Sequence, residues 1–491
     1  MARALVRTNG YMQRTVFSDS EGHFQIEGLP AGRVNLTAQK PGYVNQQDSS
    51  AYSPAWVEVG ANTGAVSLKL VPQSAIYGRV TDASGQPLEH VPLRLNSRNV
   101  REGHKHWESR GMTESDEDGH FRFANLMPGT YYLAAGPSYV ETRLLPAGEK
   151  PKAGFPSVYY PGVSDLASAS PIQLTAGQQS QADFSLSAVP VYQLAGSVVG
   201  NFGEQGVGFQ VLNQSGDEIS LPATFNMANR TFMVESVPPG SYILKAVSYA
   251  GTQALRAEMH LNVASSQDNL RLVLAPAISI PVIVRMESRG SSSPSAPSWS
   301  QGRPPVSVRL IPNDATSQES YSTFEQRGSG QDVMVLQNVD AGIYTADVMP
   351  QPPWYVQSAS YAQANLLTDD ISVTAAGQSY PMEIVLRDDS ATLSGTVKNS
   401  EGPESRTTVV VVPQSASKLS PRVVQGVAND FSVPGLAPGE YMVYAFDRVD
   451  GMEYSNADVL QPYSSQAAHV SLSANQQVHI VLDQIHVGKG D

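Results

Sequence analysis

The sequence predicts an all-β protein made of tandem antiparallel β-sandwich domains. Its 491 residues include 40 glycines and 34 prolines, with 41% hydrophobic and 16% charged residues, a mixture typical of short strands joined by many turns. One motif recurs five times at intervals of roughly 100 residues, which is the size of a domain. Its anchoring glycines are Gly32, Gly129, Gly240, Gly342 and Gly439. The sequence therefore predicts five domains in a row.

Each copy of the motif predicts one β-hairpin. Apolar residues lie eight and six positions before the anchoring glycine, which is the alternation of a strand with one buried face. These pairs are Phe24 and Ile26, Phe121 and Phe123, Phe232 and Val234, Met334 and Leu336, and Phe431 and Val433. A turn of the Pro-x-Gly type follows, and Val34, Tyr131, Tyr242, Tyr344 or Tyr441 begins the return strand. Every recurring position is apolar or a turn former, so the motif predicts scaffold, not chemistry.

The predicted domains are residues 1–74, 75–189, 190–276, 277–389 and 390–491, called domains one to five below. Domain four is the most divergent, because Pro281 interrupts its opening strand as in an edge strand, and a Ser/Pro/Gly loop spans residues 291–305. In domain five the run from Thr407 to Val412 predicts a strand buried on both faces. Proline at the domain links (Pro72, Pro190) makes them stiff, which predicts an extended array, a rod or an arc of beads.

Domain one is expected to lack its first strand. In domains two, three and five an opening Gly-x-Val strand precedes the anchoring glycine by 44 to 51 residues, at Gly78, Gly196 and Gly395. The same distance back from Gly32 falls before residue 1. A sandwich without this strand has an open sheet edge, and an open edge recruits a strand from elsewhere.

Domain two carries four segments in a characteristic order: Gly78-Arg-Val80, Gly85-Gln-Pro-Leu88, Asp118-Gly-His-Phe121-Arg-Phe123 and Pro128-Gly-Thr-Tyr131-Tyr-Leu133. This pattern resembles the carboxypeptidase regulatory-like domain. The resemblance implies a transthyretin-like, immunoglobulin-like β-sandwich that serves as an accessory module. It extends over most of the chain, loosely in domains three and four, and together with Tyr159-Tyr160-Pro161-Gly162 it suggests a tandem-domain protein of bacterial surfaces.

Charge and composition narrow the partners and the location. A net charge of −13 argues against nucleic acid and against an anionic membrane surface, and the absence of cysteine excludes disulfides and thiolate sites. The sequence contains no run of 18 apolar residues, so it predicts no transmembrane helix. The start of the chain lacks the apolar core of a signal peptide, although the resemblance implies an extracellular or cell-surface location. Either the protein stays inside, or residue 1 is not the start of the precursor, and we favour the second.

Few residues are candidates for chemistry. The clusters Asp116/Asp118 and Asp19/Glu21 could ligate calcium, but no distal bidentate Glu occurs at loop spacing, so a hairpin turn is the preferred interpretation. His104 and His106 could hold a metal, but no third ligand is identifiable, so a solvated loop is the preferred interpretation. No His-x-x-Glu ligand pair occurs, so the resemblance brings no carboxypeptidase activity with it. We predict no catalytic residue, cofactor or metal, and no enzyme.

Loop aromatics and the C-terminal tail are the better functional candidates. Aromatic side chains on loops can stack on sugars or anchor an interface, or they can simply cap their own domain. The candidates are Trp56, Tyr159, Tyr160, Trp299, Trp354 and Tyr355, with Ile485 and Val487 in the alternating tail.

Three functions fit these observations. The leading one is a structural subunit of an extracellular or cell-surface filament that binds copies of itself. The others are an adhesin or glycan-binding module for surface glycans, and the accessory region of a larger secreted enzyme or outer-membrane transporter. For the filament, the Ile485–Val487 tail of a second copy is one candidate donor for domain one; the alternative is that the missing strand was encoded upstream.

Overall fold

The computed structural model describes residues 1–9, 13–45, 55–60, 66–139, 153–214, 216, 218–251, 253–288, 304–313, 321–326, 333–374, 380–398, 407–414, 418–426 and 429–487. Within these residues the chain is all-β, and helix is confined to α1 (Ala457–Leu460) and short 3-10 turns such as Leu166–Ser168 and Gln461–Gln466. This confirms the predicted fold class of tandem sandwiches. None of the described helices is long and apolar enough to cross a bilayer.

Domain two consists of two packed sheets. The first has the order β10 (His120–Leu126), β7 (Ser74–Asp82) and β16 (Gln179–Gln181), with β17 (Phe184–Leu186) also paired to β7. The second has the order β14 (Val158–Tyr159), β11 (Gly129–Ala135), β8 (Pro92–Arg101) and β9 (His104–Glu114), with β15 (Ile172–Leu174) paired to β11. A small sheet leads on to domain three: β12 (Ser138–Tyr139), β13 (Ala153–Phe155) and β18 (Val189–Pro190).

Domain three repeats this plan. One sheet has the order β22 (Ala223–Asn226), β23 (Thr231–Val237), β19 (Tyr192–Val199) and β26 (Gln267–Val273). The other has the order β21 (Glu218–Ile219), β20 (Gly208–Asn213), β24 (Gly240–Ala250), β25 (Gln253–Val263) and β27 (Ala275–Pro276).

Domain four joins its strands into one continuous path. The order is β34 (Ala364–Asn365), β33 (Tyr355–Tyr361), β36 (Met382–Arg387), β28 (Ile278–Glu287), β31 (Val333–Val339), β30 (Tyr321–Gln326), β29 (Val306–Pro312), β32 (Gly342–Pro350) and β35 (Ile371–Val373). The expectation that the Pro281 strand lies at an edge is wrong, because β28 lies between β31 and β36. Pro281 pairs in register with Val335, next to an irregularity of the ladder between Ile278 and Ile280.

Domain five has one sheet with the order β40 (Asp430–Leu436), β37 (Ala391–Lys398) and β43 (Gln477–Asp483). Its second sheet has the order β39 (Arg422–Gln425), β38 (Thr408–Pro413), β41 (Gly439–Phe446) and β42 (Ala468–Leu472). The prediction of a doubly buried strand is confirmed, because Val409 and Val411 face the sandwich core while Val410 faces a second core with Phe446 and Leu460.

A shared design underlies domains two to five. The opening strand of each (β7, β19, β28 or β37) pairs antiparallel with the motif strand on one side. On its other side it pairs parallel with the closing strand, so the sheets are antiparallel apart from this one pair. The motif tyrosines also correspond: the hydroxyls of Tyr131, Tyr344 and Tyr441 each donate to the carbonyl four residues earlier, at 2.7 to 2.9 Å.

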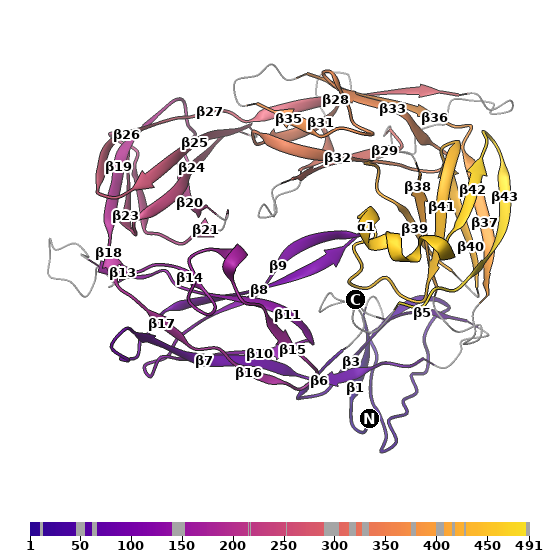
Figure 1. The fold of residues 1–491 in the computed structure, drawn as a ribbon, viewed down its shortest axis with the longest axis horizontal. Coiled ribbons are helices and arrows are strands. Elements are labelled where there is room, and N and C mark those ends of the chain that lie inside the picture. Colours follow the sequence, from indigo (N-terminus) through magenta and orange to yellow (C-terminus); the bar gives the residue numbers. More distant parts are fainter. Residues whose placement is uncertain are drawn as a thin grey trace.

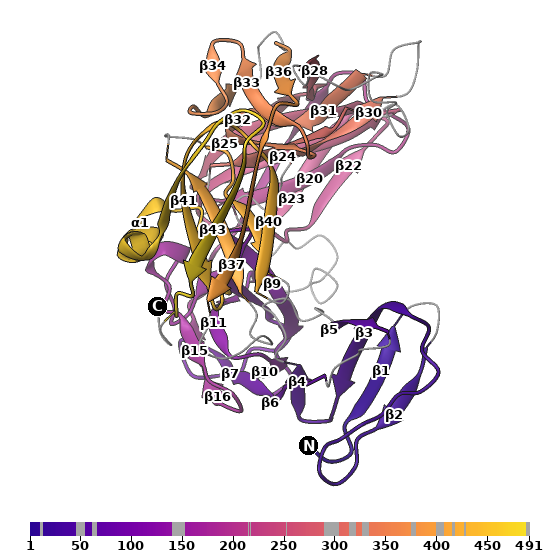
Figure 2. The same cartoon turned by 90° about the vertical axis from the view of Figure 1, so that its right-hand side faces the viewer.

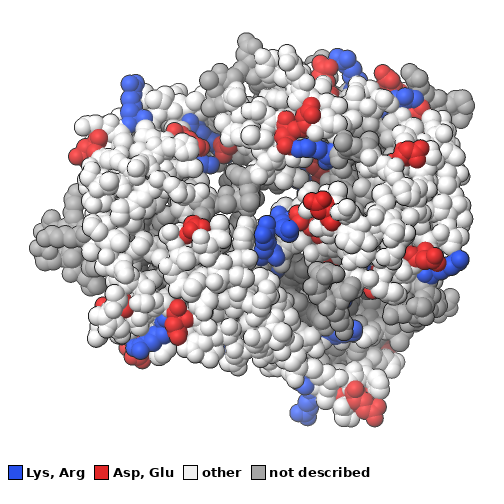
Figure 3. All heavy atoms as spheres, in the orientation of Figure 1, with Lys and Arg blue, Asp and Glu red and all other residues white. Residues whose placement is uncertain are grey.

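Of the two predicted forms of the array, the domains adopt the arc and not the rod, and this arc closes on itself. Figure 1 shows domains two to five around a central opening, with the β9 end of domain two reaching α1 of domain five. Figure 2 shows domain one projecting away from this ring. The space-filling view is hollowed at its centre, and acidic and basic side chains are interspersed on this face (Figure 3). The stiff links are consistent with the arc, since Pro72 and Pro190 both lie in strands, the first in β6 (Leu70–Pro72).

Candidate functional site

Domain one contains only half of a sandwich. Its sheet has the order β2 (Thr15–Phe17), β1 (Leu5–Asn9), β3 (Gly32–Gln39) and β5 (Ala55–Val59), and all three pairings are antiparallel. The pair formed by β4 (Tyr43–Asn45) and β6 ties this sheet to the start of domain two. Val6, Leu36 and Ala38 are buried on one face of the sheet, as the alternation of apolar residues predicts.

Domain one also contains the segments that form the second sheet in domains two to five, but these segments do not pair as strands. The motif segment with Phe24 and Ile26 lies across the apolar face, yet residues 23–27 form no strand. The same holds for residues 66–69, which correspond to the closing strand. We call the space between these two segments the open face of domain one.

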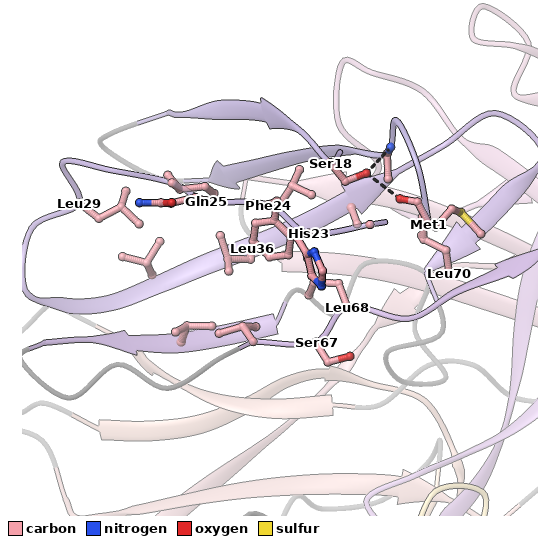
Figure 4. Close-up of a pocket in the computed structure, with 18 of the residues that line it drawn as sticks. Met1, Ser18, His23, Phe24, Gln25, Leu29, Leu36, Ser67, Leu68 and Leu70 are labelled. Carbon is pink, nitrogen blue, oxygen red and sulfur yellow. Dashed lines mark hydrogen bonds between the residues drawn. The ribbon is translucent and has the colours of Figure 1, made fainter. Parts of the chain in front are cut away.

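The open face encloses a cavity of about 830 Å³. The sheet contributes Val34, Leu36, Val57 and Val59 to its walls, and the two unpaired segments contribute Phe24, Ile26, Val66 and Leu68. Leu29 and Leu70, the first residue of β6, complete the walls. Figure 4 shows Phe24, Leu36 and Leu68 gathered around this space. The walls are thus core residues without the strand that would fill the core between them.

Exposure separates these side chains from their counterparts. Phe24, Ile26 and Leu29 are only half-buried. In domain two the corresponding Phe121, Phe123 and Leu126 are 5 to 6% exposed. Phe431 is also 5% exposed, so the predicted burial of Phe121 and Phe431 is confirmed.

One end of the open face is held in a defined shape by Asp19. Its carboxylate Oδ1 accepts hydrogen bonds from the backbone N–H groups of Glu21, Gly22 and His23 at 2.8 to 2.9 Å. The bond from His23 is the largest cause that lowers the pKa of Asp19. At the same end the Ser18 hydroxyl donates to the Met1 carbonyl at 2.7 Å, as the dashed line in Figure 4 shows. The turn therefore positions the chain at the entry to the unpaired motif segment.

The predicted calcium and metal candidates have other roles. Asp116, like Asp19, accepts hydrogen bonds from backbone N–H groups of its own turn, at 3.1 Å from Asp118 and 2.7 Å from His120. His104 and His106 lie on strand β9 and not in a loop, and the ring of His104 is partly buried against domains four and five. Within the described residues no three His, Asp or Glu side chains gather as a metal site would require.

Most of the candidate interface aromatics are not exposed. Tyr159 is 2%, Trp354 7% and Tyr355 4% exposed, and Tyr160 packs edge-on against Phe184 in the core of domain two. Trp56 lies in strand β5, where its backbone pairs with Asn35, and nothing further is described of its side chain. Trp299 lies outside the described residues.

Two of these buried aromatics also touch a neighbouring domain, whereas the hydrogen bond of Tyr355 stays within domain four. The Asn213 side chain of domain three donates to the Tyr159 hydroxyl at 3.5 Å, and Gly435 of domain five packs against the backbone of Trp354. The Tyr355 hydroxyl donates at 2.9 Å to the buried carboxylate of Asp389, which also pairs with Arg387. They are therefore part of the cores and joints of this chain, and they do not form an exposed platform for sugars.

The tail is occupied by its own domain. Ile485 is 2% exposed, its N–H donates to Ala445 at 2.7 Å, and its carbonyl accepts from Asp447 at 3.0 Å. The N–H of Val487 donates to the Asp447 carboxylate at 3.1 Å. To act as a strand donor the tail would have to leave the core around Phe446, which argues against it in that role.

Sequence reasoning missed a contact that closes the arc. We call it the clasp: the β8–β9 turn of domain two, Glu102 to Lys105, against Arg309 of domain four and Glu453–Ser455 of domain five. Arg309 pairs with Glu102 at 2.7 Å and with Asp347 at 2.9 Å, and Lys105 pairs with Glu453 at 2.5 Å. The Ser455 N–H donates to the Gly103 carbonyl at 3.3 Å. The partners of the domain-two turn lie more than 200 residues further along the chain, so no local pattern could reveal them.

The geometry can be set beside known proteins. Residues 75–187 match the carboxypeptidase regulatory-like domain family. This confirms the resemblance for domain two, the part of the chain that the match covers. A search of curated proteins finds none that matches the chain.

Solved structures with some likeness include pilins. A streptococcal ancillary pilin is 13% identical and covers 56% of this chain and 92% of its own, with a TM-score of 0.19. BcpA, the major pilin subunit of Bacillus cereus, is 9% identical and covers 64% and 99%, with a TM-score of 0.16. Shaft pilin SpaA from Lactobacillus rhamnosus GG is 10% identical and covers 42% and 97%, with a TM-score of 0.15. Likeness this weak carries no conclusion about this chain.

Proposed function

We propose that the chain is a non-enzymatic structural subunit of an extracellular or cell-surface filament, assembled from copies of itself. The observation that supports this most directly is the open face of domain one. Domains two to five form a ring of complete sandwiches, and domain one projects from it (Figure 2). Domain one has an apolar cavity and two segments that pair with no strand.

An open core of this kind favours association. Unpaired strand edges pair with other chains, and contiguous apolar surface is typical of an interaction site. Strand donation into domain one by a neighbouring subunit would join subunits head to tail. A head-to-tail contact that does not close on itself produces a filament.

Negative-stain microscopy with size-exclusion chromatography and light scattering tests the proposal on the full chain. Filaments of regular repeat are expected, with assembly lost in Leu68→Lys, which places a charge in the open face. Met112→Lys is the matched control, because Met112 is exposed on domain two and should assemble normally. Monomers at every concentration, in the purified chain and in native material alike, would overturn the proposal.

A further inference from the structure

A cavity of about 990 Å³ lies where domains four and five meet, beside the clasp. Domain four forms one wall with residues 347–350 of β32 and 355–357 of β33. Domain five forms the other wall with the end of β38, residues 419–423 leading into β39, and residues 435–441 of its motif turn (Figure 1). We call this space the joint cavity. Its volume is that of a small-molecule site, which usually measures roughly 300–1,000 Å³.

Contacts between the two domains hold these walls in place. The Ser420 hydroxyl donates to the buried carboxylate of Asp347 at 3.0 Å. The backbone N–H of Lys418 donates to the Leu367 carbonyl at 2.6 Å, and the Lys418 side chain forms an ion pair with Asp370. This part of domain five is thereby tied to domain four, so the joint cavity is a built space.

Most of the lining of the joint cavity is apolar. Both domains contribute apolar side chains, which are Val348, Met349, Val356, Leu367, Leu419 and Val423. Burial of apolar surface against such walls is favourable, so they fit a ligand with an apolar body. The few polar groups among them then decide which ligand binds.

Three arginines line the joint cavity, and carboxylates neutralise two of them. Arg309 pairs with Glu102 at 2.7 Å and with Asp347 at 2.9 Å. Arg387 pairs with Asp389. The positive charges of these two arginines are therefore already balanced within the chain.

The third arginine, Arg422, pairs with no carboxylate of the described residues. It lies on β39 opposite Val411, a core residue of domain five, so its side chain points to the inner face of the sheet. Arg422 is half-buried there, and burial lowers its pKa, with only Tyr441 acting in the opposite direction. A charged group that is partly withdrawn from water without a counter-ion is unfavourable, and a bound anion relieves this cost.

One further carboxylate borders the joint cavity, at Glu440. Its side chain is exposed, and the alternation of β41 directs it to the opposite face from Tyr441. Tyr441 and Arg422 both face the inside of the sandwich. Glu440 is therefore not placed to balance Arg422, and one positive charge remains without a partner.

We propose that the joint cavity binds a small organic monoanion, a carboxylate carried by an apolar body. Arg422 holds the carboxylate, because the planar fork of a guanidinium matches the two oxygens of this group. The apolar body lies against the walls from domains four and five. One unbalanced positive charge matches the single charge of a carboxylate. The site lies in the ring and not in domain one, so it goes beyond the proposed filament and is tested independently of it.

A matched pair of ligands tests the charge of the site. The probes are para-trifluoromethyl benzoate and its neutral amide, which have nearly the same shape, and fluorine NMR measures the affinity of the full 491-residue chain for each. The benzoate should bind about tenfold or more tightly, because hydrogen bonds between charged partners are stronger than those to a neutral amide. It should also slow hydrogen exchange at residues 348–350 and 419–423, one stretch on each wall.

Substitutions of the arginine test where the benzoate binds. Arg422→Gln should abolish the preference for benzoate over the amide. Arg422→Lys should retain part of it, because lysine keeps the charge but lacks the fork. Arg271→Gln is the matched control, since Arg271 is exposed on β26 of domain three and its replacement removes the same charge. Hydrogen exchange of β40 checks that domain five stays folded in each variant.

A structural role of Arg422 gives a different result. β39 is the edge strand of its sheet, and a charge that points inward at an edge hinders pairing with other chains. If this were its only role, Arg422→Gln would aggregate more readily and would bind benzoate like the parent chain, which would overturn the proposal. Equal affinity for the two probes, no binding of either, or protection by benzoate at residues 24–26 of domain one instead of the joint cavity would overturn it as well.

Discussion

Domains one and five carry the same hairpin motif, and only one of them turns it into a strand. In domain five Phe431 and Val433 lie on β40, paired with β37 and buried. In domain one Phe24 and Ile26 have the same spacing, but the segment is unpaired and half-buried. The comparison teaches that the alternation of apolar residues predicts which face is buried, whereas the neighbouring strand decides whether the segment becomes β-structure.

The largest effect is expected where the opening strand is tightest. Gly395→Val should destabilise domain five by about 3 kcal/mol or more, because its side chain would collide with the Ile480 carbonyl and the Phe431 ring. Hydrogen exchange resolved by domain measures this, with Val481→Ala on the exposed face of β43 as the control. A Gly395→Val domain as stable as the parent would break the rule on which the comparison rests.

The motif phenylalanines give a direct test of the same comparison. Phe431→Ala should lower the free energy of unfolding of domain five by roughly 3–5 kcal/mol, since it removes a fully packed ring. Phe24→Ala should lower that of domain one by less, about 1–2 kcal/mol, because Phe24 is less completely buried and lines a cavity. Domain-resolved denaturant unfolding measures both, and the other domains should be little affected. Equal losses would show that domain one has a closed core in solution.

The clasp sharpens the contrast between the ring and the projecting domain. Gly103 has a φ of +77°, and a Cβ there would lie 2.5 Å from the Tyr454 ring, so Gly103→Ala should open the arc. Small-angle scattering should show a larger radius of gyration. Gly85→Ala is the matched control. Gly85 has a φ of +85°, but a Cβ there would have nothing within 4 Å, so this substitution adds the backbone strain without a steric clash. An unchanged radius in Gly103→Ala would show that the clasp does not hold the arc closed.

The smallest effect is a pH dependence of the clasp. Burial lowers the pKa of His104 below its ordinary value of 6.5, while Asp347, Glu453 and Glu102 oppose this and Arg309 adds to it. The unfolded chain therefore binds the proton first as the pH falls. The contribution of His104 to the stability of the folded state is complete above about pH 6.5. It is lost as the pH falls toward the lowered pKa that His104 has in the folded state.

Hydrogen exchange at residues 453–455 should accordingly quicken below about pH 6.5, and His104→Gln should flatten this dependence. His106→Gln is the control, because His106 lies on the same strand and is exposed. A pH dependence that persists in His104→Gln would assign it to the carboxylates of the clasp.

What the sequence by itself determined is local or repetitive. The spacing of the motif, the turn residues and the alternation of apolar residues were enough to predict an all-β tandem fold and the burial of Phe121 and Phe431. These features need only the period of a strand and the chemistry of a turn. The run of β-branched residues in β38 was enough to predict a strand buried on both faces.

Only the tertiary structure decided where surfaces meet. Tyr159, Trp354 and Tyr355 follow proline-rich stretches, which predicted exposed side chains, but packing in the domain cores and joints buries them. Ile485 reads as a free strand, but the core of domain five takes it up. The arc closes through Glu102, Arg309 and Glu453, which belong to three domains. Packing of this kind depends on the angles between domains, and no short-range pattern in the sequence encodes those angles.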